Sequence, residues 1–311
     1  MTDQTATDTA NTTGNWGRWG AEDERGALNL IDPAGVAAAA REVRTGRSYA
    51  LGLPIQREGV PVFPHRGAPQ RLTLSDHTDD MGMGREGGED VRSYEDVLVL
   101  ASHSITHMDA LCHVQHQGKF YNGFDAATFR TRTGAERCGI EKIGAFTARA
   151  VLLDLPRYQG VERLELGYPI TSADLAGCAA AQDVEMRSGD VLLVRTGYID
   201  YWLAETRAGR EPVYAQAGLT RDSVSFIRDH DIAAVGADNS AIEVMPFDNG
   251  VFLTVHIALL VQLGLPLMEH LWLTDLASGM AEAGTHACLL SVSPLPVTGA
   301  TGSPINPVAL V

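Results

Sequence analysis

The segment from His103 to His113 constrains the fold of this chain more than any other feature of its sequence. Its eleven residues hold three histidines and one aspartate: His103, His107, Asp109 and His113. Neutral imidazole and carboxylate are ligands that zinc, manganese and iron prefer. Because His107 and Asp109 lie two positions apart, they fit an extended or irregular backbone better than one face of a helix. The segment therefore predicts a metal site, with a solvated polar loop that includes His116 as the alternative.

An apolar run at residues 97–101 comes directly before this cluster. Short runs rich in valine and leucine are typical of a buried strand. A strand that ends in a group of polar residues would place those residues on a rigid scaffold. We therefore predict a buried strand at 97–101 that leads into the candidate site.

Two residues far along the chain could complete a ligand set. His256 lies in the apolar stretch 251–260, where a lone histidine is more often a core residue than a ligand. Glu269 is also flanked by apolar residues, and burying its carboxylate unpaired would cost several kcal/mol. Glu269 therefore needs a partner, which a metal ion could provide. The adjacent His270 is expected on the surface or behind the ligands.

One helix is expected near the N-terminus, at 33–42, and from Ala148 onward strand and helix patterns alternate. The expected strands are 150–154, 189–195, 232–236 and 288–293, and the expected helices are 33–42, 172–181, 220–229 and 253–263. Asp32 is placed to cap the first of these helices, and Thr171 or Ser172 the second. This alternation indicates an α/β fold with mixed sheets and flanking helices.

The chain shows no linker, so we predict one domain over residues 15–311. The threonine-rich tail 1–14 is expected to be disordered. Residues 51–95 are rich in glycine and proline without period, which is typical of a lid or binding loop. The part at 81–88 is either a flexible piece of that loop or a plain disordered insertion.

Composition excludes several classes of protein. The net charge is −15 without a clustered basic stripe, so a nucleic-acid partner is not expected. The four cysteines form no CxxC pair, and Cys112 is expected to be a buried hydrophobe. No apolar run approaches the ~20 residues of a membrane span, and the first residues lack a secretory signal. We therefore expect a cytoplasmic protein that does not bind a membrane.

The segment 103–113, His-Ser-Ile-Thr-His-Met-Asp-Ala-Leu-Cys-His, resembles the HxGTHxDxPxH signature of the cyclase family of metal-dependent hydrolases. That family includes bacterial kynurenine formamidase and isatin hydrolase. Ile105 stands where the family has glycine and Leu111 where it usually has proline. The resemblance extends to residues 236–240 and 299–304. It implies the swivelling β/β/α cyclase-like fold. It also implies dimers whose N-terminal segments reach the neighbouring site.

The resemblance also implies roles for the candidate residues. The first ion would be held by His103, His107 and Asp109, joined by Glu269; Asp109 and Glu269 could bridge to a second ion that His256 binds. His113 is predicted to act as general base and then as acid. We expect Zn²⁺, with Mn²⁺ as the alternative, at one or two ions per chain. Two other residues have less specific roles. Asp238 would orient an imidazole or cap a turn, and Tyr121 belongs to a turn unless it faces the metal.

Together these features predict hydrolysis of an amide, lactam, imide, ester or lactone bond in a small cyclic or aromatic carbonyl compound. Apolar residues surround the candidate ligands in sequence, which favours a small neutral substrate; they are Leu111, Phe120, Phe252, Leu267 and Met268. Apolar groups in 16–30 and 51–88 also favour a homo-oligomer, a dimer or a tetramer.

Two alternatives remain. One is an iron(II) oxygenase that uses His107, Asp109 and His256 as its ligands. That reading expects a β-rich jelly roll and an arginine about ten residues after the distal histidine, where this chain has Pro266. The other is a metal-binding protein without catalysis, whose closed coordination sphere would leave no room for water.

Overall fold

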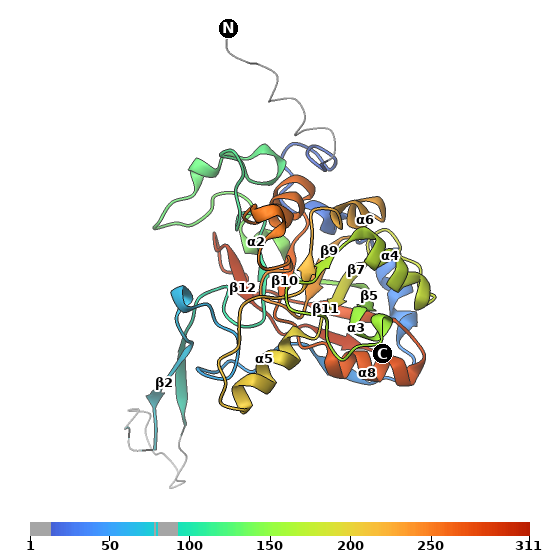
Figure 1. Ribbon diagram of the computed structural model, residues 1–311. Coiled ribbons are helices and arrows are strands. Elements are labelled where there is room, and N and C mark those ends of the chain that lie inside the picture. The colour runs from blue at the N-terminus through green and yellow to red at the C-terminus, as the bar shows by residue number, and fades with distance from the viewer. Residues whose placement is uncertain (1–13, 78, 80–92) are drawn as a thin grey trace, which may run out of the picture.

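The computed structural model describes residues 14–77, 79 and 93–311, so the predictions for the tail 1–13 and the segment 81–88 lie outside the described residues. A nine-stranded mixed sheet forms the centre of the molecule (Figure 1). In spatial order its strands are β1 (Ser48–Ala50), β13 (Val308–Leu310), β11 (Ala287–Val292), β5 (Phe146–Asp154), β7 (Val191–Arg195), β9 (Ala234–Ala237), β10 (Leu267–Glu269), β4 (His107–Asp109) and β12 (Gly302–Pro304).

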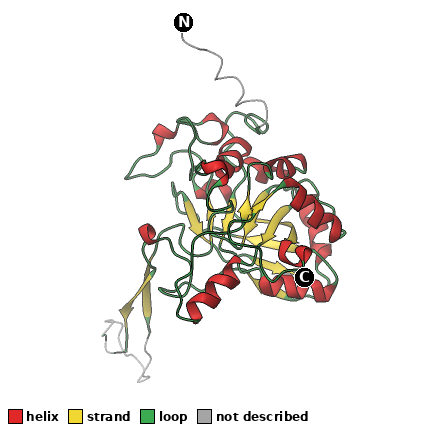
Figure 2. Cartoon of the chain, viewed as in Figure 1, coloured by secondary structure: helices red, strands yellow, loops and turns green. Residues whose placement is uncertain are grey.

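Helices flank this sheet (Figure 2). The α-helices are α1 (Pro33–Ala39), α2 (Ile140–Ile143), α3 (Leu155–Gln159), α4 (Ser172–Ala181), α5 (Tyr198–Arg207), α6 (Val224–Asp229), α7 (Thr254–His256) and α8 (Thr274–Ala283). Short 3-10 turns are η1 (Gly26–Leu30), η2 (Ala40–Glu42), η3 (Pro64–Arg66), η4 (Tyr121–Gly123), η5 (Ala126–Thr128) and η6 (Asp248–Gly250), and η7 (Ile257–Leu263) is a π-helix. No helix among the described residues is long and apolar enough to span a membrane.

Four central strands, β5, β7, β9 and β10, run parallel to one another. Such strands are covered on both faces by crossover helices, which is why their sequences are nearly continuous apolar runs. Val191, Leu192, Leu193 and Val194 of β7 are all at most 1% exposed. The prediction of an α/β fold with mixed sheets and flanking helices is confirmed.

Local capping signals explain where two helices begin. The Asp32 carboxylate accepts a hydrogen bond from Gly35 N before α1, and Thr171 forms a capping box with Asp174 before α4. Two expected helices differ in detail: the one predicted at 220–229 begins only at Val224, and the one at 253–263 is divided into α7 and the π-helix η7.

A second, two-stranded antiparallel sheet consists of β2 (Gln70–Ser75) and β3 (Glu95–Val99) and extends from the body at the lower left of Figure 1. The prediction of a buried strand at 97–101 was wrong. A strand forms, but its five residues are exposed, because it pairs with β2 outside the nine-stranded sheet and five of the six residues of β2 are exposed as well. Within the described part of 51–95, residues 64–66 and 70–75 form regular structure, so this part is less irregular than predicted.

The strand that carries the candidate ligands is β4. It lies between β10 and β12 and is antiparallel to both. In this register Glu269 pairs with His107, and Leu267 pairs with Asp109. Because β10 runs parallel to β9 and β4 runs against it, the first residue of β4 lies at the carboxyl edge of the parallel strands. Ligands of open α/β proteins bind at this edge.

Candidate metal centre

Strands β4 and β10 bring three candidate ligands together. His107 and Asp109 lie two positions apart on β4 and are 0% and 1% exposed, so their side chains project from the same face of the strand. Glu269 is the cross-strand partner of His107. Its Oε2 atom lies 3.3 Å from His107 Nε2, and Asp109 Oδ1 lies 3.5 Å from the same nitrogen.

The fourth residue, His256, comes from α7. Its Nε2 atom lies 3.3 Å from Glu269 Oε1 and 3.8 Å from Asp109 Oδ2. Two triads result, each with ligand atoms within 4.8 Å of one another: His103, His107 and Asp109, and Asp109, His256 and Glu269. Asp109 belongs to both. The arrangement has the donors for one ion, or for two that share Asp109.

The donor set fits a divalent cation. Within the described part of the chain, His107 Nε2 and Asp109 Oδ2 are buried without a hydrogen-bond partner. Buried polar atoms of this kind almost always have a partner in native proteins. Imidazole nitrogen and carboxylate oxygen are also the ligand types of zinc and manganese sites. A metal ion between the two triads would therefore satisfy both atoms.

The charges of the cluster also favour a bound cation. Burial would raise the pKa of the Asp109 carboxyl, but the rings of His113, His103 and His107 hold it well below its ordinary value. Burial and Asp109 would likewise raise the pKa of Glu269, whereas His107 and His256 lower it to about 2. Both carboxylates are therefore ionised at neutral pH. Despite burial, the pKa of both His107 and His256 is raised by the carboxylates around them, so a cation that replaces the protons of these two rings should release protons on binding.

His103 and His113 form the outer part of the cluster. Their rings stack with centroids 3.9 Å apart. His103 Nδ1 contacts Asp109 Oδ1 at 2.8 Å, and its Nε2 contacts the Thr301 hydroxyl at 2.9 Å, so His103 must release one of these contacts in order to bind a metal. His113 is partly exposed. Burial lowers the pKa of His113 to about 4, so its ring is neutral at pH 7 and has one unprotonated nitrogen.

One carbonyl oxygen fixes the orientation of two histidine rings. The Ile105 carbonyl contacts Nδ1 of His107 at 2.7 Å and Nδ1 of His270 at 2.9 Å. Ile105 has φ +57°, a left-handed conformation that is a genuine outlier for a β-branched residue. Sequence reasoning identified this position because related proteins have glycine there. His270 is 1% exposed, so it is not a surface residue.

A residue that sequence reasoning missed is Glu243. It is 0% exposed, and its Oε1 lies 2.6 Å from His256 Nδ1 and accepts from His256 N at 3.1 Å. A hydrogen bond that a metal-binding imidazole donates to a carboxylate fixes the tautomer and orientation of the ring. Glu243 and Glu269 raise the pKa of His256 to about 10 against the effect of burial. The available signal was a glutamate among apolar residues at 241–245.

Asp238 does not contact an imidazole in this structure. Its carboxylate accepts hydrogen bonds from Thr196 N, the Thr196 hydroxyl and Gly197 N, each at 2.7 Å. Of the two roles considered for Asp238, the turn cap is confirmed. It fixes the segment that joins β7 to α5.

Three other sequence interpretations can be compared with the structure. Tyr121 directs its hydroxyl to Asp23 Oδ2 at 3.0 Å, so it serves the N-terminal segment. Phe252 was expected near the ligands, but it is 69% exposed. Cys112 is the buried hydrophobe that was predicted, since burial raises the pKa of its thiol to about 12.

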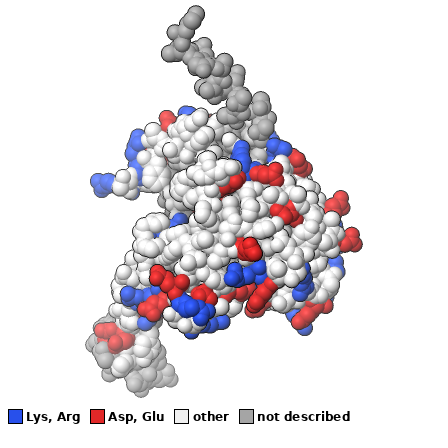
Figure 3. Space-filling view, in the orientation of Figure 1, with Lys and Arg blue, Asp and Glu red and all other residues white. Residues whose placement is uncertain are grey.

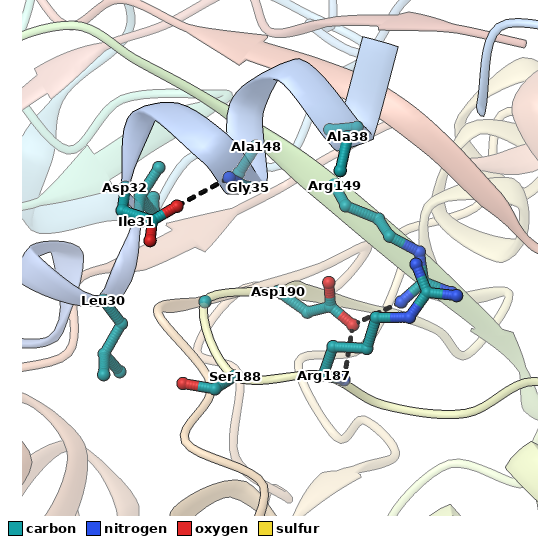
Figure 4. Close-up of a pocket in the computed structure, with 12 residues that line it drawn as sticks. Leu30, Ile31, Asp32, Gly35, Ala38, Ala148, Arg149, Arg187, Ser188 and Asp190 are labelled. Atoms are coloured by element: carbon teal, nitrogen blue, oxygen red, sulfur yellow. Dashed lines mark hydrogen bonds and ion pairs between the residues drawn. The ribbon is translucent and has the colours of Figure 1, made fainter. Parts of the chain in front are cut away.

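A cavity of about 260 Å³ lies between α1, strand β5 and the turn at 187–190 that precedes β7 (Figure 4). None of its lining residues is a candidate ligand. Its polar wall contains Arg149, whose guanidinium donates to Asp190 at 2.6 Å and to Glu42 at 3.1 Å. Arg149 and Asp190 of this cavity thus pair with each other, which suits a structural role. Acidic and basic side chains are also interspersed on the face in Figure 3.

Comparison with known proteins decides the family. The Cyclase family model matches residues 49–244. A crystal structure described as that of a novel cyclase is 36% identical; the match covers 96% of this chain and 98% of that chain, with a TM-score of 0.86. This chain belongs to the cyclase family. The predicted resemblance is confirmed, and so is the cyclase-like fold.

More distant structures share the fold. Isatin hydrolase A from Labrenzia aggregata, bound to benzyl benzoate, is 19% identical, with 89% of this chain and 96% of that chain covered and a TM-score of 0.61. A protein described as a potential metal-dependent hydrolase with cyclase activity is also 19% identical, with 85% and 98% covered and a TM-score of 0.51. A comparison with curated protein sequences gave no match.

Proposed function

We propose that this protein is a metal-dependent hydrolase that cleaves an amide, lactam, imide, ester or lactone bond in a small cyclic or aromatic compound. The observation that carries this proposal is the buried donor set of β4, β10 and α7. Within the described residues, two of its atoms, His107 Nε2 and Asp109 Oδ2, have no hydrogen-bond partner. The fold neighbours described as isatin hydrolase and as a potential metal-dependent hydrolase support it.

The proposed ligands are His103, His107, Asp109, His256 and Glu269, and the proposed ion is Zn²⁺ or Mn²⁺. A divalent ion bound there would lower the pKa of a water molecule and polarise a carbonyl group. Ionised Asp109 and Glu269 provide the negative charge that retains the ion.

His113 is the proposed general base. Its ring is neutral at pH 7 and partly exposed, so it can take a proton from water and pass it to the leaving group. His103 stacks against it at 3.9 Å and restricts the orientation of its ring.

Activity on a panel of carbonyl compounds tests the proposal. The panel consists of N-formyl aromatic amines, lactams, lactones and cyclic imides, given to zinc-loaded and manganese-loaded protein. We expect hydrolysis of at least one class, with a rate that rises with pH through about 7 as water ionises. Metal-loaded protein that hydrolyses none of these compounds would contradict the proposal.

The oxygenase alternative is not favoured by the structure. It expects a β-rich jelly roll, whereas the described residues form an α/β sheet with four parallel strands and crossover helices. Turnover that requires both oxygen and iron(II) would restore it. The metal-binding alternative without catalysis predicts a bound ion and no hydrolysis of any compound in the panel.

We also propose that the protein is a homodimer or homotetramer that uses the sheet of β2 and β3. Its exposed apolar side chains include Leu72 at 50%, Leu74 at 65% and Leu98 at 55%. An isolated two-stranded sheet is marginally stable in water, and exposed apolar strands tend to pair with another chain. A second copy would cover these residues. Light scattering that shows a monomer at micromolar concentration with full activity would contradict this proposal.

The N-terminal segment supports an interface less than the sequence suggested. Trp16 is 37% exposed, but its indole N–H donates to the Val261 carbonyl at 2.6 Å, and Leu28 is 0% exposed. This segment packs on its own chain, so β2 and β3 carry the argument for an oligomer.

A further inference from the structure

His270 is held by three hydrogen bonds, but one of its ring nitrogens is left over. Its Nδ1 contacts the Ile105 carbonyl at 2.9 Å, its backbone N–H donates to the Asn239 carbonyl at 2.9 Å, and its own carbonyl accepts from the Thr106 hydroxyl at 2.6 Å. Because a carbonyl only accepts, Nδ1 carries the hydrogen and Nε2 presents a lone pair in the neutral ring. In the described part of the chain, Nε2 is buried without a hydrogen-bond partner.

The position of His270 in the sheet places it beside the candidate metal site. It follows directly after β10, whose last residue, Glu269, is a candidate ligand. Leu271 N, the next backbone donor, binds the carbonyl of Ala237 at the end of β9 at 3.0 Å. His270 therefore lies at the carboxyl edge of the parallel strands, where open α/β sheets bind ligands. Its ring centroid is 5.8 Å from that of His107.

In the part of the chain that the structure describes, the unpartnered polar atoms on the segments next to His270, which include the Ser240 hydroxyl, can all accept a hydrogen bond. Asn239 Oδ1 is buried and, among the described residues, has no partner, whereas its amide NH₂ donates to the carbonyls of Ala217 at 2.8 Å and Ile242 at 3.3 Å. The Ser104 hydroxyl, next to Ile105, is likewise buried and unpartnered within the described ranges, and it can accept or donate. Since buried polar atoms rarely lack a partner, a ligand that brings an N–H or O–H donor would satisfy an acceptor such as His270 Nε2.

We propose that His270 Nε2 accepts a hydrogen bond from an N–H group of the substrate. The site then favours amides, lactams and imides with a free N–H over esters and lactones of the same shape. This inference rests on the proposed hydrolase function and narrows its substrate class. His270 acts as a specificity-determining residue, because a substrate without the donor leaves a buried acceptor unpaired.

A matched pair of compounds tests the inference. Isoindolin-1-one and phthalide differ only in a ring N–H or a ring oxygen. The ratio of their Kd values, or of their kcat/KM values where they are hydrolysed, is measured on zinc-loaded wild type and on H270F. Phenylalanine fills similar space without an acceptor, so we expect the preference for the lactam to fall about tenfold. An unchanged ratio in H270F, or no binding of either compound to wild type, overturns the inference.

Two control variants separate recognition from folding. H270Q keeps an acceptor and should retain part of the preference for the lactam. H230F removes a ring whose Nδ1 also contacts a backbone carbonyl, that of Phe226 at 2.8 Å, outside the metal cluster; it should leave the ratio unchanged. If His270 had a purely structural role, H270F would bind both compounds more weakly by the same factor. This result would contradict the inference. Failure of the hydrolase proposal would look different. The wild-type protein would still bind the lactam more tightly than phthalide, but it would hydrolyse no compound in the panel.

Discussion

Two pairs of antiparallel strands in this protein have opposite surroundings. In β4 and β10 all six residues are buried, and the pair carries three candidate ligands. In β3 all five residues are exposed, although Val97, Leu98 and Val99 are as apolar as the first two residues of β10, Leu267 and Met268. The difference shows that side-chain character predicts a strand, whereas burial depends on which elements cover it. β10 is covered because it continues the parallel sheet beyond β9.

The largest effect is expected from a residue beside the buried pair. His113→Ala should lower kcat by roughly 10²–10⁴-fold, the usual contribution of general acid–base catalysis. The bound ion should remain, because His113 lies outside both triads. Steady-state kinetics and elemental analysis of the same sample provide the measurement. His116→Ala, in the same loop, serves as the control; a variant of His113 that loses its metal would mean that this residue is a ligand.

A smaller effect is expected from Glu243, which lies behind the buried pair. Glu243→Gln keeps the size of the side chain but removes the charge that holds His256 Nδ1 at 2.6 Å. Loss of such a partner typically weakens metal affinity by about 10–100-fold. A competition titration with a chelator measures this affinity. Glu282→Gln, which changes an exposed partner of Arg47, is the control. If both variants bind the metal with the same affinity, Glu243 does not position His256.

A third prediction concerns how the backbone conformation of Ile105 affects the free energy of unfolding. Ile105→Ala and Ile105→Gly both remove a buried side chain, but only glycine relieves the left-handed conformation at φ +57°. We therefore expect the glycine variant to have the higher free energy of unfolding, by about 1 kcal/mol. Denaturation with urea measures the difference. Ile199 lies in helix α5 and in the same small core, and there the alanine variant should be more stable than the glycine variant. If alanine is the more stable variant at both positions, the left-handed conformation of Ile105 is not strained.

The smallest effect contrasts the two strand pairs directly. Leu98→Ala on β3 removes a side chain that is 55% exposed and should change the free energy of unfolding of the monomer by about 0.5 kcal/mol or less. Met268→Ala on β10, at 0% exposure, should cost about 2–5 kcal/mol. Leu98→Ala should instead promote dissociation of the oligomer in light scattering. A large loss of monomer stability would show that β3 is buried within its own chain.

Sequence reasoning could predict the members of the site whose chemistry is local. The segment from His103 to His113 was recognised from residue types and spacing alone, and Glu269 from the cost of burying an unpaired carboxylate. Glu243 and the orientation of His270 could not be predicted in this way. Their roles depend on contacts with residues 13 and 165 positions away. The exposure of β3 was missed for the same reason, because it depends on which strand pairs with it.

Elemental analysis of protein purified without chelator tests the central claim, that β4, β10 and α7 hold a catalytic metal ion. We expect about one to two divalent ions per chain, from the count of histidine and carboxylate ligands. His107→Ala should lose the ion together with hydrolase activity, whereas His116→Ala should keep both. Wild-type protein that contains no metal and takes up neither zinc nor manganese would contradict the account.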